Sequence, residues 1–392
     1  MQQGKVQRPI NGDPNVNDLL CKFAASISVR QLPLAKATKI ISGNYKAGRC
    51  YILDAERLLR LRGLAKQDTS RRVRLLHHVY TWVRIVGEST YVTHDYSAYG
   101  SIIEQTGLSR QIRTSHAGDA THDDRLDDFL RLEEHASDSD LDIENPKEPV
   151  RGRRDIHLED SRDSADTLYP RVYGIPETWL SLLSQITRLA NLMEVVQTSC
   201  KQSRLELSEI LQRRAARLED MVCTFASRPV SDTTRAHHLQ TDEQANMINA
   251  PPVSPNCHML RALNSALEIF FYRRIRNVHP RILQGHVDGV INALQNLDEA
   301  LPNSNSLKPG TAWPAFMAGC EAISSNQRDY VRAWMQRAFS TTGMQAFKTA
   351  QEIMVEVWNK RDSDDSGGSR SIKTQTSWVT LARERSLWLM LC

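Results

Sequence analysis

Apolar side chains recur every three to four residues along most of this chain, which is the spacing of an amphipathic helix. β-branched residues do not alternate with polar ones, and the Asp288-Gly289 pair lies inside a helical pattern rather than between two strands. The longest helical runs lie at residues 45–62, 73–86, 179–196, 203–225, 259–271 and 287–301. The pattern therefore predicts an all-α fold, a helix-hairpin array or bundle.

One stretch, Trp313-Pro314-Ala315-Phe316-Met317-Ala318-Gly319-Cys320-Glu321-Ala322, is the most informative motif. It begins with an aromatic residue and a proline, which suits the start of a helix, and continues with small residues. A helical run follows it and ends at Trp358. The spacing of its apolar positions predicts a packing motif rather than a catalytic one.

Residues 109–168 interrupt the helical pattern. Between Asp119 and Asn145 there are eleven acidic residues and two basic ones, a composition that favours a disordered acidic insertion. Four apolar residues are interleaved with the acids, so the segment could serve as an activation-type interaction tract. A plain charged linker is the alternative. The interleaved residues are Leu126, Phe129, Leu130 and Leu132.

These breaks in pattern predict the organisation of the chain. The predicted parts are a disordered start at 1–15, a first helical part at 16–108, the charged insertion at 109–168, a main helical part at 169–360 with a linker at about 227–256, a flexible break at 361–370 and a C-terminal helical tail at 371–392. The two helical parts are expected to form one large domain interrupted by the insertion.

Composition excludes several classes of protein. Of the 392 residues, 50 are Lys or Arg and 46 are Asp or Glu, so the net charge of +4 is far from that of a dedicated nucleic-acid binder. The seven cysteines are widely spaced, without a Cys-x-x-Cys pair, which disfavours a zinc site built from paired cysteines and fits a reducing compartment. No signal peptide and no apolar window of membrane-spanning length is visible.

The usual signatures of catalysis and metal binding are absent from the sequence. The pairs His77-His78 and His237-His238 point about 100° apart if helical, so neither pair converges on one metal. The acidic pairs Asp123-Asp124 and Asp127-Asp128 could be imagined as a cation site, but a solvated acidic segment is the plainer interpretation. The sequence therefore predicts no enzyme, and no catalytic, cofactor-binding or metal-ligating residue.

Two basic stretches and five tryptophans leave alternatives open. The basic stretches could contact phosphate, but their place on the polar sides of amphipathic helices favours a solvated surface. The tryptophans could line a ligand pocket, although helical spacing is more typical of core residues. The residues concerned are Arg57, Arg60, Arg62, Lys66, Arg71, Arg72 and Arg74; Arg273, Arg274, Arg276 and Arg281; and Trp82, Trp179, Trp313, Trp334 and Trp358. Arg84 and Glu88 have the i,i+4 spacing of a helix-stabilising pair.

Several stretches together resemble the fungal-specific transcription factor domain family, found in zinc-cluster transcription regulators. They are Ala55–Leu64, Arg84–Tyr91, Asp155–Asp160, Tyr169–Gln185 with Arg188–Asn191, and the Trp313–Ala322 motif with Trp358. Each alone is a weak helix pattern. The resemblance covers residues 16 to 385.

The resemblance implies the regulatory (middle homology) domain of a nuclear transcription regulator that controls RNA polymerase II transcription of metabolic genes through protein–protein contacts. Homo- or heterodimers, transcriptional coregulators and a small metabolite effector are the implied partners, with no membrane. In the family, DNA is contacted by an N-terminal binuclear zinc cluster with six cysteines. That module is missing here, so the resemblance implies no zinc or other cofactor within this chain.

Two alternatives remain beside this interpretation. One is a non-DNA-binding scaffold, or a dominant competitor of a full-length relative through shared dimer contacts. The other is an all-helical enzyme, which would need acidic residues on helices that face a cavity, whereas the acidic pairs here lie in a linker-like sequence. Target genes, the inducing metabolite and the dimer surface do not follow from the sequence.

Overall fold

The computed structural model describes residues 71–92, 174–198, 204–227, 254–301, 307, 310–366 and 377–391. Within these ranges every regular element is helical, which confirms the all-α prediction. The predicted disordered start and the acidic insertion lie outside the described residues.

The helices agree closely with the apolar runs predicted at 73–86, 179–196, 203–225, 259–271 and 287–301, while the run at 45–62 lies outside the described residues. They are α4 (Arg71–Ser89), α8 (Glu177–Thr198), α9 (Arg204–Ser227), α10 (Pro255–Arg274), the short 3-10 helix η4 (Pro280–Leu283), α11 (Gln284–Ala300), α12 (Ala312–Glu321), α13 (Ser325–Thr342), α14 (Gln345–Ser366) and α15 (Trp378–Glu384). The Asp288-Gly289 pair lies inside α11, as its surrounding pattern predicts.

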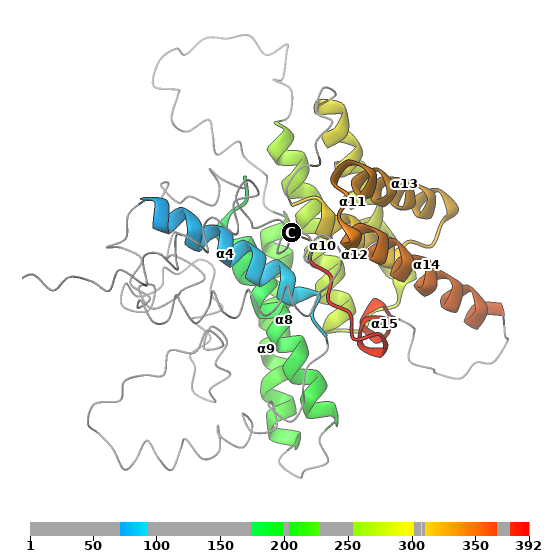
Figure 1. Cartoon of the computed structure of the whole chain (residues 1–392). Helices are drawn as coiled ribbons and strands as arrows, with labels where there is room; N and C mark the ends of the chain where they lie inside the picture. The colour runs from blue at the N-terminus through cyan, green and yellow to red at the C-terminus, as the bar shows by residue number, and fades with distance from the viewer. Residues whose placement is uncertain are drawn as a thin grey trace, which may run out of the picture.

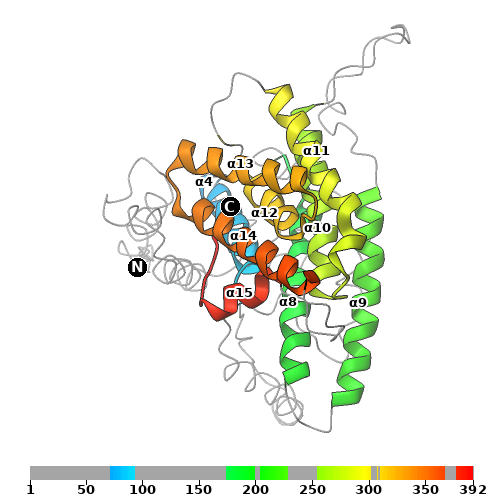
Figure 2. The ribbon, with the colours of Figure 1, turned by 90° about the vertical axis from the view of Figure 1, so that its right-hand side faces the viewer.

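The helices pack as hairpins of chain neighbours. α8 lies beside α9, α10 beside α11, and α13 beside α14, and α4 crosses α8 obliquely (Figure 1). α10 joins the two sides of the molecule because it contacts α8 and α9 as well as α11 and α12. Seen from the side, α8 and α9 extend past the other helices as a long pair (Figure 2).

Helix α12 lies at the centre of this arrangement. It carries the Trp313–Ala322 motif, and all ten of its residues are buried. Four helices surround it: α10, α11, α13 and α14. A helix that is apolar on all sides must be buried, so the composition of the motif accounts for its central position.

The helical run after the motif is two helices rather than one. Ser324 begins α13 with a capping box, because its side chain accepts a hydrogen bond from the Gln327 backbone N–H while the Gln327 side chain accepts one from the Ser324 backbone. Gly343 ends α13 in the left-handed conformation at φ 68°. The two signals allow α13 and α14 to fold back on each other.

The C-terminal part differs in detail from its predicted organisation. α14 continues to Ser366, six residues into the stretch 361–370 that the composition predicts as a break. After α15, Ser386 has a φ of 49°, and Leu387–Leu391 continue without helical structure. Over the described residues 377–391, the helical tail expected at 371–392 is therefore a short helix followed by a non-helical end.

Gly319 should be the least replaceable described glycine of the core. A β-carbon at this position would lie far inside van der Waals contact of Met354 Sδ on α14. We expect Gly319→Ala to lower the free energy of unfolding by about 1–3 kcal/mol through overpacking, measured by urea denaturation. Gly285→Ala is the matched control, because nothing lies within 4 Å of its β-carbon position and alanine favours a helix. Equal effects of the two substitutions would refute this account.

Candidate functional site

The tryptophans of the sequence form a packed aromatic cluster. Trp179 stacks on Trp82 with ring centroids 6.1 Å apart and meets Trp313 edge-on at 5.5 Å. Phe270 of α10 contacts the other side of Trp313 at 5.6 Å. The cluster therefore joins α4, α8, α10 and α12 through three ring contacts.

Three of the indole N–H groups of this core have a hydrogen-bond acceptor inside the protein. Trp313 Nε1 donates to Ser89 Oγ at 2.9 Å, and Trp179 Nε1 donates to the Leu263 carbonyl at 3.2 Å. Trp358 Nε1 donates to the Gly319 carbonyl at 2.9 Å. All five tryptophans singled out in the sequence are at most 4% exposed. Their interpretation as core is confirmed, because all five belong to the cluster of buried apolar residues at the centre of the helices.

The second basic stretch is not the solvated surface that its sequence suggests. Arg273 lies 2.9 Å from Glu321 of α12, and Arg274 pairs with Glu194 of α8. Arg276 Nε donates to Glu219 of α9 at 2.8 Å. Three arginines at and just after the end of α10 thus reach three different helices. The solvated-face interpretation is wrong for Arg273 and Arg274, whose side chains are 3% exposed.

Glu321 is the buried centre of an arginine–glutamate–arginine group. Its side chain is 1% exposed and lies between Arg273, whose Nε is 2.9 Å from Oε1, and Arg361 of α14, whose Nη2 donates to Oε2 at 3.1 Å. The Arg273 contact is an ion pair without hydrogen-bond alignment, while Arg273 Nη1 donates to the Val278 carbonyl. One carboxylate therefore compensates two buried guanidinium groups.

Burial governs the electrostatics of this group. Burial lowers the pKa of Arg361, although the negative charge of Glu321 raises it. Burial likewise raises the pKa of the neighbouring Cys320 thiol well above its ordinary value. Arg361 also donates a hydrogen bond to the Cys320 carbonyl at 3.1 Å. This carbonyl is one of those at the end of α12 that have no partner within the helix, so the arginine satisfies it. Cys320 is therefore a small neutral core residue and not a reactive thiolate.

The other carbonyl groups at the end of α12 are also bound. Gln284 of α11 donates from Nε2 to the Glu321 carbonyl at 3.0 Å, and Arg328 of α13 donates from Nε to the Ala322 carbonyl at 3.3 Å. Arg328 in turn holds Asp362 of α14 with two contacts of 2.7 and 2.8 Å. Side chains from α10, α11, α13 and α14 thus converge on one helix end.

Other sequence predictions have mixed outcomes. The Arg84–Glu88 pair forms within α4, as its spacing predicts. Arg281 of the second basic stretch is exposed on η4. The first basic stretch, both histidine pairs and the acidic pairs lie outside the described side chains. Among described residues, no three His, Cys, Asp or Glu side chains come together as metal ligands would. No described helix has the length and apolarity needed to cross a bilayer.

Sequence reasoning missed the carboxylates that pair with the arginines of α10. Glu194 and Glu219 give no local signal, because charged residues are ordinary on the outer side of a helix. Glu321 did give one: it is the single charge in an otherwise apolar motif. A lone charge among core residues indicates a buried partner of opposite sign.

Comparison with known proteins agrees with the resemblance seen in the sequence. The model of the fungal specific transcription factor domain matches residues 19–392. The chain is 19% identical over 359 residues to "Arginine metabolism regulation protein II" of Saccharomyces cerevisiae. That match covers 83% of this chain but 38% of the relative. No solved structure matches. Because the family model spans nearly all of the sequence, the chain belongs to the fungal-specific transcription factor domain family.

Proposed function

We propose that this chain is the regulatory domain of a fungal transcription regulator and acts in the nucleus through protein–protein contacts. Dimer partners and coregulators of RNA polymerase II transcription of metabolic genes are the expected targets. The match of the family model over residues 19–392 carries the proposal. DNA would be contacted by a different module, since the six-cysteine zinc cluster of the family does not occur in these residues.

The structure supports a role in presenting surfaces rather than in chemistry. The most polar contacts of the interior, those at the end of α12, are ion pairs and hydrogen bonds between helices, and they hold α10, α11, α13 and α14 in fixed positions. The outward sides of α13 and α14 carry charged residues such as Arg332, Arg337 and Glu352. A rigid helical body with a charged exterior suits reversible contact with other proteins.

The proposal is tested by tethering. The whole chain is fused to an unrelated DNA-binding domain in a fungal host, and transcription of a reporter gene with the matching DNA site is measured. We expect reporter transcription to rise or fall several-fold relative to the DNA-binding domain alone. A fusion carrying Trp313→Ala, which should be destabilised by about 3–5 kcal/mol, controls for effects of mere attachment.

A fusion that leaves the reporter unchanged, although it accumulates to the level of the DNA-binding domain alone, would overturn the proposal. An equal response from the Trp313→Ala fusion would overturn the part that assigns the activity to the folded helical domain. Tethering residues 109–168 alone would then test whether the acidic insertion is the active element.

A further inference from the structure

The last described residues, 377–391, are named here the C-terminal segment. They comprise the short helix α15 and a non-helical end, Leu387–Leu391. A closed turn joins the two parts: Ser386 has a φ of 49°, and the Leu387 backbone N–H donates to the Ala382 carbonyl at 2.8 Å. The turn ends α15 and directs the rest of the segment to α4 (Figure 1).

The end of α4 and the C-terminal segment satisfy each other's polar groups. Trp388 Nε1 donates to the Gly87 carbonyl at 2.6 Å, and Thr90 Oγ1 donates to the Leu389 carbonyl. The Trp388 ring also meets Tyr91 edge-on, with ring centroids 6.4 Å apart. A β-carbon on Gly87 would lie 3.0 Å from this ring, so the glycine makes room for the indole. Three of the last residues before the described range ends at 92 thus contact the segment.

The helical body contacts α4 separately. Trp313 of α12 donates from Nε1 to Ser89 Oγ at 2.9 Å, and Trp82 of α4 stacks on Trp179 of α8. α4 is therefore held by the body through two aromatic side chains and by the segment through Trp388 and Leu389.

The other end of the C-terminal segment is anchored on α12. Trp378 is 2% exposed and meets Phe316 edge-on, with ring centroids 5.7 Å apart. Leu381 and Leu391 are also buried and belong to the same core cluster. The segment thus covers apolar side chains of the body over its whole length.

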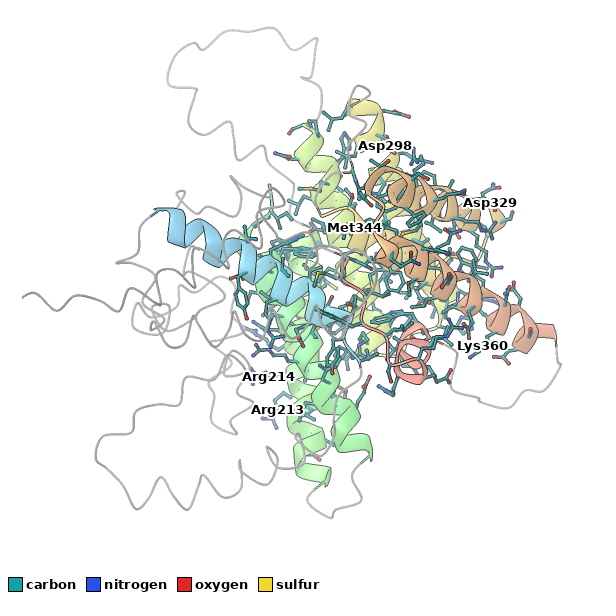
Figure 3. The ribbon with its side chains drawn as sticks, in the orientation of Figure 1. Arg213, Arg214, Asp298, Asp329, Met344 and Lys360 are labelled. Carbon is teal, nitrogen blue, oxygen red and sulfur yellow. The ribbon has the colours of Figure 1, made fainter. Side chains whose placement is uncertain are left out.

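Ion pairs add to these apolar contacts. Arg383 reaches Glu194 of α8 at 2.7 Å, and Glu384 lies 3.4 Å from Lys360 of α14. Lys360 lies on the stretch of α14 near α15 (Figure 3). These pairs are partly exposed, so each contributes little on its own. Docking of the segment therefore depends mainly on its apolar anchors, and one of them is seated on α4.

The centre of the body is held together by other contacts. The carbonyl groups of Cys320, Glu321 and Ala322 accept hydrogen bonds from α14, α11 and α13, and the Glu321 carboxylate pairs with α10 and α14. These contacts come from neither α4 nor the C-terminal segment. Because α4 and α15 are the first and last described helices, their departure interrupts none of the hairpins α8–α9, α10–α11 and α13–α14.

We infer that the C-terminal segment is a strap for α4, and that α4 and the segment leave the body together as one cooperative unit while α10 to α14 stay folded. Without the segment, Thr90 and Tyr91 lose their partners and a gap opens beside Gly87. Without α4, the buried indole N–H of Trp388 loses its acceptor, which carries a desolvation cost. Neither element therefore stays docked without the other. The inference is independent of the role in transcription proposed above.

Opening of this unit has a defined consequence for the surface of the protein. Trp179 loses the stacked ring of Trp82, and Phe316 loses the ring of Trp378. The strap thus controls exposure of an aromatic face formed by α8 and α12. Proteins open locally in contiguous units of this kind, each with its own free energy of opening.

The first test is native-state hydrogen exchange on the unaltered full chain, followed by mass spectrometry at increasing urea below the unfolding transition. We expect peptides from 79–92 and 377–391 to share one opening free energy and one urea dependence, and to exchange at least about tenfold faster than peptides from 257–271 and 312–321. Different urea dependences for the first two regions would overturn the cooperative unit. Exchange as slow as that of α10 and α12 would overturn its separate opening.

A second test changes the contact itself. Trp388→Ala should accelerate exchange in 79–92 at least about tenfold and leave 257–271 within about threefold. The control, Thr380→Ala on the exposed side of α15, should change neither. Gly87→Leu alone should accelerate exchange of 79–92, but combined with Trp388→Ala it should slow that exchange, because leucine then occupies the space of the indole. Equal acceleration in all helices, or unchanged exchange in 79–92 of the Trp388→Ala chain, would refute the strap.

Discussion

Replacing Trp313 by alanine is expected to cause the largest loss of stability of any single truncation in the aromatic core. The side chain is fully buried, contacts Trp179 and Phe270, and donates a hydrogen bond to Ser89. Truncating a buried tryptophan removes its apolar contacts and leaves a cavity, which costs about 3–5 kcal/mol. Urea denaturation followed by far-UV circular dichroism measures the effect.

Two variants separate the causes of this loss. Trp313→Phe keeps most ring contacts but removes the N–H, so its loss should be smaller than that of the alanine variant. Ile282→Ala is the surface control, because Ile282 is 73% exposed and should change the free energy of unfolding by no more than about 0.5 kcal/mol. If Trp313→Ala destabilised the chain no more than Ile282→Ala, the described core would be wrong.

Glu321→Gln should be nearly as damaging, for an electrostatic reason. The substitution keeps the shape of the side chain but removes the one carboxylate between the buried Arg273 and Arg361. Breaking a buried ion pair by removing one partner costs about 3–5 kcal/mol, because the other charge stays in a medium that solvates it poorly. The same denaturation experiment measures the loss.

The matched control for Glu321→Gln is Asp329→Asn on α13. Asp329 also pairs with an arginine, Arg332, but its side chain is 68% exposed, so water screens the pair. We expect a change of about 0.5 kcal/mol or less. A second comparison replaces Arg273, Glu321 and Arg361 together by methionine or leucine. This triple variant should recover much of the loss, since an apolar group needs no compensating charge. Similar losses in Glu321→Gln and Asp329→Asn would contradict the described burial.

The family and the central packing motif were accessible from the sequence because they depend on local order. The helical spacing of apolar residues identified the helices, and the uninterrupted apolar character of Trp313–Cys320 marked α12 as a buried helix. The capping box at Ser324 and the C-cap glycine Gly343 are equally local signals. They mark the two ends of α13, although the apolar spacing continues past Gly343 into α14.

The pairing of charges was not accessible in the same way. Arg273, Arg274 and Arg276 lie close together at and just after the end of α10, and a cluster of this kind usually faces water. Their carboxylate partners, Glu194, Glu219 and Glu321, come from three other helices. Only the packing of those helices brings each carboxylate within contact distance, and it turns a surface pattern into buried pairs.

The sequence by itself determined that this chain is all-helical, that Trp313–Ala322 lies in its core, and that it resembles a family of fungal transcription regulators, since periodicity and motif content are properties of consecutive residues. The tertiary structure alone decided that Glu321 sits between two arginines and that Trp388 docks against Gly87, 301 residues earlier in the chain. Contacts of such separation depend on how the helices pack, and no local pattern of side chains records them.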